Sequence, residues 1–199
     1  MKFKHVPVLG ILALLISCKE TAKKDESTEN TTTVETQEET NSFEETATDA
    51  KTLEIELTPK SDSNVTGSVV FVEADGMVTM SANLSGLSEG THAIHIHEKA
   101  DCSSADGKST GGHWNPTKQP HGKWGSSEGY HRGDIGNFKA DADGIGTITF
   151  ATNEWCIGCD DALENILGKA IIVHAGTDDY TSQPSGAAGS RVSCGAVIQ

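Results

Sequence analysis

The chain has no excess of positive charge, no long apolar run and little helical periodicity. Its 15 Lys and Arg residues stand against 29 Asp and Glu residues, for a net charge of −14. Neither the first 50 residues nor the remainder is basic, which argues against a nucleic acid partner. The longest apolar run, residues 6–16, is too short to span a bilayer as a helix of the mature protein.

The N-terminus has the features of an export signal. A basic start, Met1 to His5, precedes the apolar run, as in secretory signal peptides. The run ends in Leu-Ile-Ser followed by Cys18, which resembles the bacterial lipobox, where a small residue precedes a lipidated cysteine. We therefore predict a lipoprotein signal peptide over residues 1–17 and a lipid anchor on Cys18. The alternative is ordinary signal cleavage with a coincidental cysteine, against which the lack of a nearby small-x-small site counts.

Residues 18–50 are rich in Thr and Glu and hold only two large apolar side chains, Val34 and Phe43. Such a segment cannot bury enough surface to offset the entropy of ordering, so we expect a disordered tether. Residues 51–199 have the length of one domain with a full core. The predicted protein is an exported cell-envelope lipoprotein, and the tether allows the domain to face the periplasm or the cell surface. The membrane would be contacted through the N-terminal lipid only.

Beyond Cys18 the chain has four cysteines, Cys102, Cys156, Cys159 and Cys194. An even number in an exported domain favours disulfides, and four cysteines allow three pairings. The Cys-x-x-Cys spacing at 156–159 could instead bind zinc or act as a redox motif. It has no second cysteine pair and no βαβ context, so we favour an oxidised, structural pair there.

Alternating apolar residues and turn signals predict short antiparallel strands at 53–57, 65–73, 77–84, 92–97, 133–140, 145–151, 169–174 and 192–198. With so little helical periodicity, the expected fold is an all-β sandwich or barrel. Two long segments, 98–132 and 175–191, interrupt the strands. Loops of this length in a compact domain are usually functional or disordered.

Histidines concentrate on one predicted strand and on the segments after it. On the strand 92–97, His95 and His97 share a face, whereas His92 lies an odd number of residues from both and faces the other way. We assign His92 a structural hydrogen-bonding role. A lone histidine on an apolar strand is more often a core residue than a ligand. Here, however, six candidate nitrogen ligands and one carboxylate occur together, a set that suits a transition metal: His95, His97, His113, His121, His131, Asp134 and His174.

At these residues the domain resembles the copper/zinc superoxide dismutases, specifically the bacterial exported type. The matching segments occur in the family's order and cover most of residues 52–199: Gly-Thr-His-Ala-Ile-His-Ile-His (90–97), Gly-His-Trp-Asn-Pro (112–116), His-Gly (121–122), His-Arg-Gly-Asp-Ile-Gly-Asn (131–137), Val-His (173–174) and Gly-Ser-Arg-Val-Ser-Cys-Gly (189–195). The resemblance implies an eight-stranded antiparallel Greek-key β-barrel with two long functional loops.

The resemblance also implies one copper and one zinc ion per subunit. Copper would be bound by His95, His97, His113 and His174, and zinc by His113, His121, His131 and Asp134. Four imidazoles suit Cu(II), and three imidazoles with a carboxylate suit tetrahedral zinc. His113 can serve both ions because imidazole has two nitrogens.

Further roles follow from the same resemblance. Asp178 would link a copper histidine to a zinc histidine, although neighbouring Asp179 offers an alternative for that position. Arg191 would attract and orient the superoxide anion, and Cys102 would form a disulfide with Cys194. The Cys156–Cys159 pair has no counterpart in the usual family pattern.

The implied activity is a two-step dismutation of superoxide to oxygen and hydrogen peroxide. Copper would alternate between Cu(II) and Cu(I), and His113 would deliver a proton to the product. The expected role is protection of the cell envelope from oxidative damage. One alternative is a lipoprotein that sequesters or delivers copper without turnover, which the loss of a copper histidine or of Arg191 would favour. A zinc hydrolase is the other, but Asp134 closes the open zinc position that it would need. The sequence leaves monomer and homodimer open.

Overall fold

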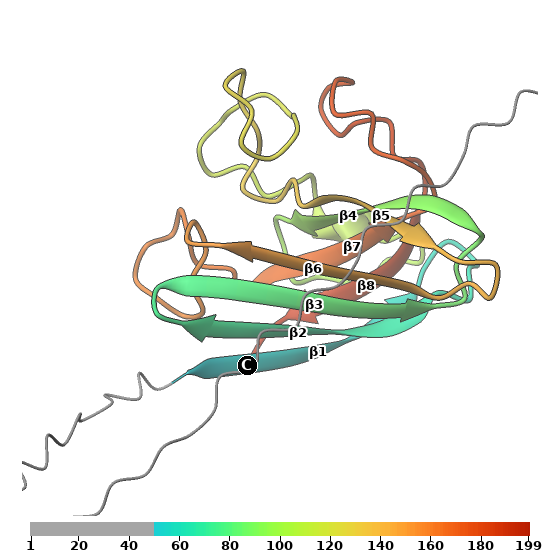
Figure 1. Cartoon of the computed structure of the whole chain (residues 1–199), viewed down its shortest axis with the longest axis horizontal. Coiled ribbons are helices and arrows are strands. Elements are labelled where there is room, and N and C mark those ends of the chain that lie inside the picture. Colours follow the sequence, from blue (N-terminus) through green and yellow to red (C-terminus); the bar gives the residue numbers. More distant parts are fainter. Residues whose placement is uncertain (1–49) are drawn as a thin grey trace, which may run out of the picture. The chain divides into compact units, whose positions relative to one another are not determined.

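The computed structural model describes residues 50–199, so the predicted signal peptide, Cys18 and the tether lie outside the described residues. Figure 1 shows the described part as strands with long connecting loops. In chain order the elements are β1 (Lys51–Pro59), β2 (Thr66–Ala74), β3 (Met77–Ser85), β4 (Gly90–His97), the 3-10 helix η1 (Lys108–Thr110), β5 (Gly136–Ala140), β6 (Gly146–Thr152), β7 (Lys169–His174) and β8 (Arg191–Val197). Within these residues no helix is long and apolar enough to cross a membrane.

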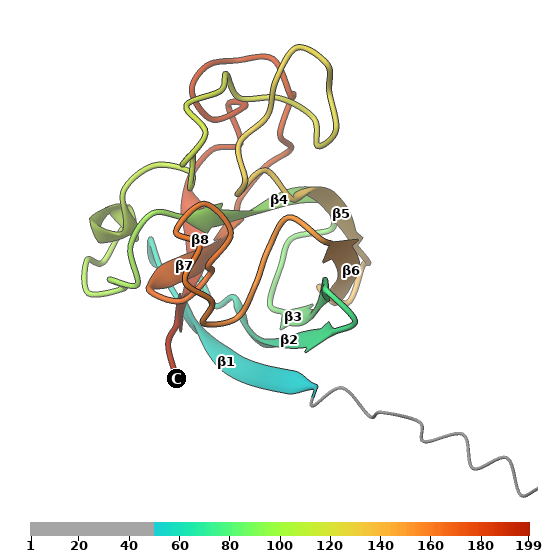
Figure 2. The same ribbon diagram turned by 90° about the vertical axis from the view of Figure 1, so that its left-hand side faces the viewer.

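The eight strands close into an antiparallel barrel with the order β1-β2-β3-β6-β5-β4-β7-β8 (Figure 2). Strands β4, β5 and β6 follow one another, and β7 returns to lie beside β4, which is a Greek-key connection. Two neighbouring strand pairs of the barrel are joined through only one or two residue pairs. Strand β1 meets β8 through Thr58 and Pro59, and β5 meets β6 through Ala140 and Gly146. The barrel predicted from the sequence is confirmed.

Alternation along the strands places one face of each in the core. In β1 the side chains of Leu53, Ile55 and Leu57 are buried and their neighbours are exposed. Strand β4 departs from this pattern because all its residues from His92 to His97 are buried. The two long loops cover its outer face, so this strand has a core on one side and loop residues on the other.

All eight predicted segments form strands, with one difference in the fifth. We expected it to begin at Gly133, but β5 begins at Gly136. The backbone of Gly133 instead bridges two other segments, because its N–H donates to the carbonyl of Trp114 and its carbonyl accepts from the N–H of Ile96, each at 3.0 Å. Residues 133–135 therefore belong to the loop.

The two long loops rise from the same side of the barrel (Figures 1 and 2). They are joined by the side-chain amide of Gln183. Its Oε1 accepts a hydrogen bond from the backbone N–H of His121 at 2.8 Å, and its Nε2 donates to the carbonyl of His121 at 2.9 Å. This contact holds the loop after β7 against the loop after β4.

Candidate metal centre

Strand β4 separates its apolar and histidine side chains onto opposite faces. Ile94 and Ile96 point into the barrel core, and His95 and His97 lie on the other face beneath the loops. His92 follows the parity of the isoleucines and packs beside the ring of Phe138. The two nitrogens of His92 face the carbonyls of Ser88 and His174, both at 2.9 Å. The structure thus separates His92 from the other histidines.

Strand β7 brings a third histidine beside this pair. His95 is opposite Ile172 in the antiparallel register, and His174 ends the strand next to a shift in register. The ring centroid of His174 lies 4.9 Å from that of His95 and 5.6 Å from that of His97.

His113 lies at the centre of the histidines. A single antiparallel bridge holds its backbone beside His97. Its ring centroid lies 4.0 Å from that of His95 and 5.0 Å from that of His97. On its other side, the centroids of His121 and His131 are 5.3 and 5.7 Å away. His113 therefore borders two groups of side chains.

Asp134 organises the second group. Its Oδ1 lies 2.8 Å from His113 Nδ1 and 3.2 Å from His131 Nδ1, and its Oδ2 lies 3.0 Å from His121 Nδ1. Backbone N–H groups of His131 and Gly122 also donate to Oδ2, at 2.8 and 3.2 Å. The chain itself thus fixes the carboxylate in the middle of three imidazoles.

Each group offers ligand atoms that lie within 4.8 Å of one another: His95, His97, His113 and His174 in the first, and His113, His121, His131 and Asp134 in the second. Buried ring nitrogens without a hydrogen-bond partner are uncommon and call for an explanation. In the first group they are His95 Nδ1, His97 Nε2, His113 Nε2 and His174 Nε2, and in the second His121 Nδ1 and His131 Nδ1. Metal ligation explains all six, so the donor sets fit copper and zinc.

Hydrogen bonds on the far side of each ring select which nitrogen is free. Nδ1 of His97 lies 3.0 Å from the carbonyl of Gly111, and Nδ1 of His174 lies 3.4 Å from the carbonyl of Gly189. Such a bond fixes the tautomer and leaves Nε2 for the metal. His95 is reversed: its Nε2 faces a carboxylate, and Nδ1 is free.

Burial keeps His97, His113 and His174 of the first group neutral. It lowers the pKa of His97 and His174 well below the ordinary value, and neighbouring imidazoles lower it further. Burial likewise lowers the pKa of His113 to about 4, although Asp134 opposes the shift. Neutral imidazoles carry the lone pairs that bind a metal, so these rings need not lose a proton before they bind a metal at neutral pH.

Asp178 connects the two groups. Its Oδ2 lies 2.8 Å from His95 Nε2 and its Oδ1 lies 2.9 Å from His121 Nε2, and all three side chains are fully buried. Asn137 orients this aspartate through its side-chain amide, which bonds the backbone of Asp178 at 2.8 and 2.9 Å. Asp179 is exposed and its carboxylate accepts from Thr181 and Ser182 instead. The linking aspartate is thus Asp178.

The protonation of His121 in the second group depends on the carboxylates of Asp134 and Asp178. Burial alone would lower the pKa of His121, but the nearby carboxylates of Asp134 and Asp178, at 3.0 and 2.9 Å, outweigh it and raise the pKa to about 9. Burial would raise the pKa of both aspartates, but their hydrogen bonds with the histidines hold it well below the usual range. Without metal, His121 is therefore a cation between two anions, and a divalent ion would replace its proton.

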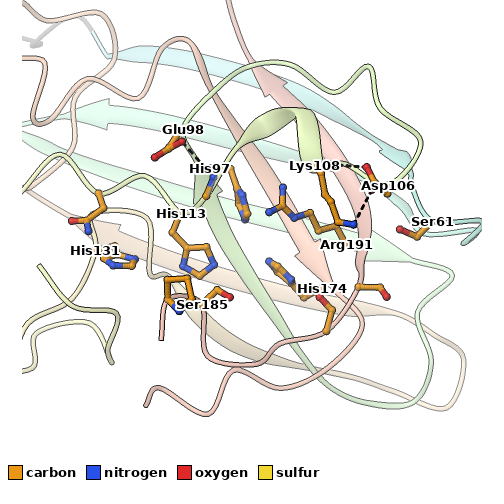
Figure 3. A pocket seen from close by; sticks show the side chains of 15 residues that line it. Ser61, His97, Glu98, Asp106, Lys108, His113, His131, His174, Ser185 and Arg191 are labelled. Carbon is orange, nitrogen blue, oxygen red and sulfur yellow. Dashed lines mark hydrogen bonds and ion pairs between the residues drawn. The ribbon is translucent and has the colours of Figure 1, made fainter. Parts of the chain in front are cut away.

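An open cavity of about 580 Å³ reaches the first group. His97, His113, His174 and Arg191 line it, and Figure 3 shows Arg191 between the histidines and the ion pair of Lys108 with Asp106. Burial lowers the pKa of Arg191, and the negative charge of Asp106 opposes this shift. The cavity therefore places a guanidinium beside the copper-type ligand set.

The 3-10 helix η1 fixes this guanidinium. Arg191 Nη1 donates to the carbonyl of Gly107 and to Oγ1 of Thr110, both at 2.9 Å, and the hydroxyl of Thr110 donates to the same carbonyl at 2.9 Å. Thr110 is completely buried. Nη1 is thus held by two acceptors that are hydrogen-bonded to each other.

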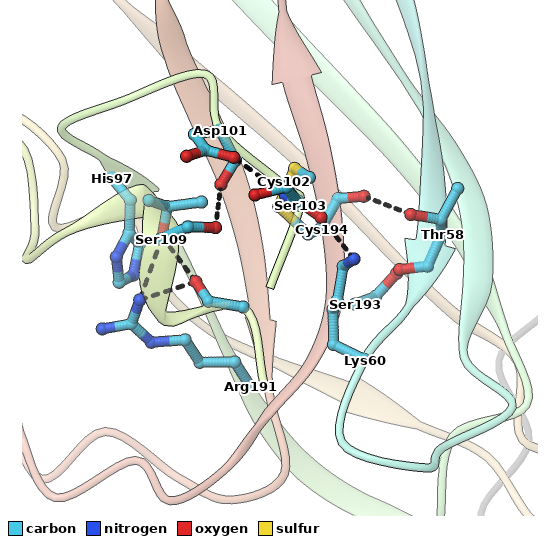
Figure 4. The surroundings of a disulfide bond; sticks show 12 residues. Thr58, Lys60, His97, Asp101, Cys102, Ser103, Ser109, Arg191, Ser193 and Cys194 are labelled. Atoms are coloured by element: carbon cyan, nitrogen blue, oxygen red, sulfur yellow. Dashed lines mark hydrogen bonds between the residues drawn. A yellow bond between two sulfur atoms is a disulfide. The ribbon is translucent and has the colours of Figure 1, made fainter. Parts of the chain in front are cut away.

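A disulfide between Cys102 and Cys194 ties the loop after β4 to β8, and the carbonyl of Cys102 accepts a hydrogen bond from Lys60 (Figure 4). The two cysteines are 92 positions apart, and the bond lies three residues beyond Arg191. A second disulfide joins Cys156 and Cys159 in the loop between β6 and β7.

The sequence did not reveal the residues that hold these groups in place. Asn137, Gln183 and Thr110 act through hydrogen bonds to backbone or guanidinium groups of residues far away in sequence. No periodicity or spacing marks them. Asn137 stood within a recognised segment, but its bond to Asp178 depends on the folding of the two long loops.

Residues 65–197 match the family model described as copper/zinc superoxide dismutase (SODC). Superoxide dismutase [Cu-Zn] 2 of Mesembryanthemum crystallinum is 35% identical over 143 residues, which cover 68% of this chain and 88% of the plant protein. A SOD-like protein from Bacillus subtilis superposes with a TM-score of 0.65 at 30% identity, over 73% of this chain and 97% of that protein. A double mutant of it gives a TM-score of 0.66 at 32% identity, with the same coverage.

The fold and the site together define a β-barrel metalloprotein with adjacent copper-type and zinc-type ligand sets that share one histidine. The chain belongs to the copper/zinc superoxide dismutase family, and both metal-binding groups of that family are present in it.

Proposed function

We propose that this protein catalyses the dismutation of superoxide to oxygen and hydrogen peroxide and thereby protects the cell envelope. The observation that carries this proposal is the cavity that Arg191 shares with His97, His113 and His174 of the first group. Copper, when bound by His95, His97, His113 and His174, would supply the alternating one-electron oxidation and reduction, and zinc would occupy the second group.

Arg191 supports turnover of a small anion rather than metal storage. Only its Nη1 makes hydrogen bonds with residues in the described part of the chain, so Nε and Nη2 can donate to a ligand. A guanidinium at the edge of a cavity attracts an anion by charge and orients it by fixed donors. A protein that only sequesters copper has no need of such a group.

His113 is suited to hold a proton at the cavity. Its Nδ1 is directed to the second group, and its Nε2 has no hydrogen-bond partner. While no metal is bound, Nδ1 donates its proton to Asp134; zinc on Nδ1 would displace that proton, and the one proton of a neutral imidazole would then lie on Nε2. From there it can be given to the peroxide product, which needs two protons to leave as hydrogen peroxide.

The activity is tested by measuring copper, zinc and superoxide consumption on the purified protein together with Arg191→Ala and His113→Ala. We expect many turnovers per copper in the parent protein. Arg191→Ala should be slower and less sensitive to salt while retaining copper. Stoichiometric consumption of superoxide would support the sequestering alternative, and full activity without copper would contradict the mechanism.

We also propose export as a lipoprotein anchored through Cys18. The support is the signal-like segment with its lipobox and the disulfides of the domain, since disulfides persist in oxidising compartments. A Cys18→Ser variant should lose incorporation of labelled fatty acid and leave the membrane fraction. Labelling that persists in this variant would contradict the anchor.

A further inference from the structure

The disulfide Cys156–Cys159 lies in the loop that joins β6 to β7, a segment that the metal centre does not use. No residue of 153–168 lines the metal cavity. In Figure 1 this orange loop leaves β6 at the left of the view, while the two long loops rise above the barrel. The bond therefore needs an explanation of its own.

Backbone and side-chain hydrogen bonds hold both cysteines independently of the disulfide. The N–H of Cys156 donates to the carbonyl of Glu164 at 2.9 Å, and the carbonyl of Cys156 accepts from the N–H of Ile166 at 3.1 Å. The amide of Asn165 donates to the carbonyl of Cys159 at 2.9 Å. These bonds close the loop on itself whether or not the sulfur atoms are joined.

Ile157, the first of the two residues between the cysteines, anchors the loop to the barrel. Ile157 is 1% exposed and belongs to the main core. Its N–H donates to Oε2 of Glu73 and its carbonyl accepts from Nζ of Lys51, both at 2.9 Å. Reduction of the disulfide would break none of these contacts.

The disulfide also restrains the unfolded chain less than the Cys102–Cys194 bond does. Its cysteines are 3 positions apart, against 92 for Cys102 and Cys194. The loop-closure contribution grows with the length of the closed segment, so it is small for this ring. A purely structural role would therefore stabilise the protein by less than half as much as the Cys102–Cys194 bond does.

The two sulfur atoms differ in access. Cys156 is 6% exposed, whereas Cys159 is half-buried between the exposed residues Gly158 and Asp160. A thiolate must approach a sulfur atom along the disulfide axis to exchange with it. Cys159 is the sulfur that an external thiol can reach.

We propose that Cys156–Cys159 is a thiol–disulfide exchange site that accepts two electrons from an external thiol while the barrel and the metal centre stay intact. The thiolate attacks Cys159 Sγ, the Cys156–Cys159 bond breaks, and Cys156 leaves as a thiolate that takes a proton from water. A second thiol then attacks the mixed disulfide on its external sulfur. Cys159 is released as a thiol, and the two external thiols leave as their disulfide.

The charge around the site selects the class of thiol. Segment 153–168 contains four acidic residues and no Lys or Arg. Glu154 is paired with Arg132, and Lys51 contacts the carbonyl of Ile157 and pairs with Glu73, so the unpaired negative charge comes from Asp160, Asp161 and Glu164. Asp160 is exposed and directly follows the reachable cysteine. Exposed carboxylates next to a reactive sulfur atom repel an anionic reagent and attract a cationic one. The proposed substrates are therefore aminothiols or a dithiol protein with a basic face, in preference to carboxylate-bearing thiols.

The first experiment treats the folded protein with cysteamine, traps free thiols by alkylation and locates them by peptide mass spectrometry. We expect alkylation at Cys156 and Cys159 while Cys102–Cys194 remains oxidised and the near-ultraviolet circular dichroism is unchanged. If Cys156–Cys159 opens only together with Cys102–Cys194, or with loss of that spectrum, the disulfide is structural and the proposal fails.

Thiols also bind copper, so metal loss needs a matched control. A Cys156→Ala/Cys159→Ala variant treated in the same way shows how much metal cysteamine removes by chelation alone. We expect equal loss from both proteins. Greater loss from the parent protein would show that the bond supports the metal centre and would overturn the proposal. If the variant does not fold, the alkylation pattern of the parent protein still decides.

The second experiment compares cysteamine, 2-mercaptoethanol and 3-mercaptopropionate, with rates corrected for the thiolate fraction of each. At low salt each step in this order should slow exchange by roughly threefold or more, and 1 M salt should remove most of the difference. Asp160→Asn should narrow the range of rates, because within residues 50–199 this carboxylate forms no hydrogen bond or ion pair and contributes only its charge. Equal rates for the three thiols would contradict the selectivity.

Discussion

Asp178 Oδ1 lies 2.9 Å from Nε2 of His121, and its other oxygen lies 2.8 Å from Nε2 of His95. One buried carboxylate thus orients a ligand in each metal group. Because both oxygens are used, the copper-type and zinc-type groups are coupled through a single side chain as well as through the shared ring of His113.

Asp178→Asn should weaken the binding of both metals. An amide offers one acceptor and places an N–H₂ group toward the other imidazole, so one ring loses its orientation. Loss of such a partner typically costs ten- to a hundredfold in metal affinity. Competition with a chelator measures the affinity of the variant for copper and for zinc. Asp179→Asn is the matched control because Asp179 is exposed and does not touch the histidines, and an equal loss there would contradict the assignment.

Gly186→Ala should reproduce that loss without replacing a ligand residue. Gly186 has φ +66°, and a Cβ there would overlap Oδ1 of Asp178 and approach His121 Nε2 to 2.7 Å. Gly168→Ala is the control for backbone strain, since Gly168 has φ +81° and nothing within 4 Å of its Cβ position. We expect chelator-resistant zinc to fall only in Gly186→Ala. Equal behaviour of the two variants would assign the effect to the backbone conformation alone.

Thr110→Val should slow superoxide consumption with copper retained. Valine keeps the shape but removes the acceptor that holds Arg191 Nη1 at 2.9 Å. One such hydrogen bond is worth about 1 kcal/mol, or roughly fivefold in kcat/KM. Thr110→Ser keeps the hydroxyl and should restore most of the rate. A Thr110→Val protein with normal kcat/KM and normal salt dependence would show that the carbonyl of Gly107 positions Arg191 without help.

The metal-free protein should be most stable near pH 6.5. An unfolded histidine has a pKa near 6.5. Between about pH 4 and 6.5 the unfolded chain binds more protons, because burial lowers the pKa of His113 to about 4, so the free energy of unfolding rises with pH. Between about pH 6.5 and 9 the folded chain holds the extra proton, because the pKa of His121 is about 9, so stability falls.

Urea unfolding of the metal-free protein at pH 5, 6.5 and 9 measures this dependence. The metal-loaded protein is the control, since bound metal replaces the proton of His121 and should remove the decrease between pH 6.5 and 9. A metal-free protein with equal stability at pH 6.5 and 9 would contradict the raised pKa of His121.

Replacing Cys102 and Cys194 by alanine should cost far more than replacing the other pair. In the chain-entropy model the long closure is worth roughly 4 to 5 kcal/mol and the ring of Cys156 and Cys159 about 2 kcal/mol. Denaturant unfolding of the two double variants compares them directly. Similar losses would show that native packing around the sulfur atoms, rather than loop closure, sets the contribution of each bond.

The sequence by itself predicted the barrel and the ligand residues because both are written in local patterns. Strand alternation gave eight strands, and parity on β4 separated His92 from His95 and His97. The misplaced start of β5 shows the limit of such patterns. Gly133 fits an extended strand, but bonds to Trp114 and Ile96 take up its backbone groups.

Tertiary structure alone decided how these residues act. Asp178 and Asp179 are adjacent and chemically identical, and only the packing of the loops buries the first between His95 and His121. The partners Thr110 and Gln183 bond groups that are 81 and 62 positions away. Hydrogen bonds at such separations depend on how the closed barrel brings its loops together, which no local periodicity contains. The sequence determined which residues can bind metal, and the fold determined which nitrogen of each ring is free to do so.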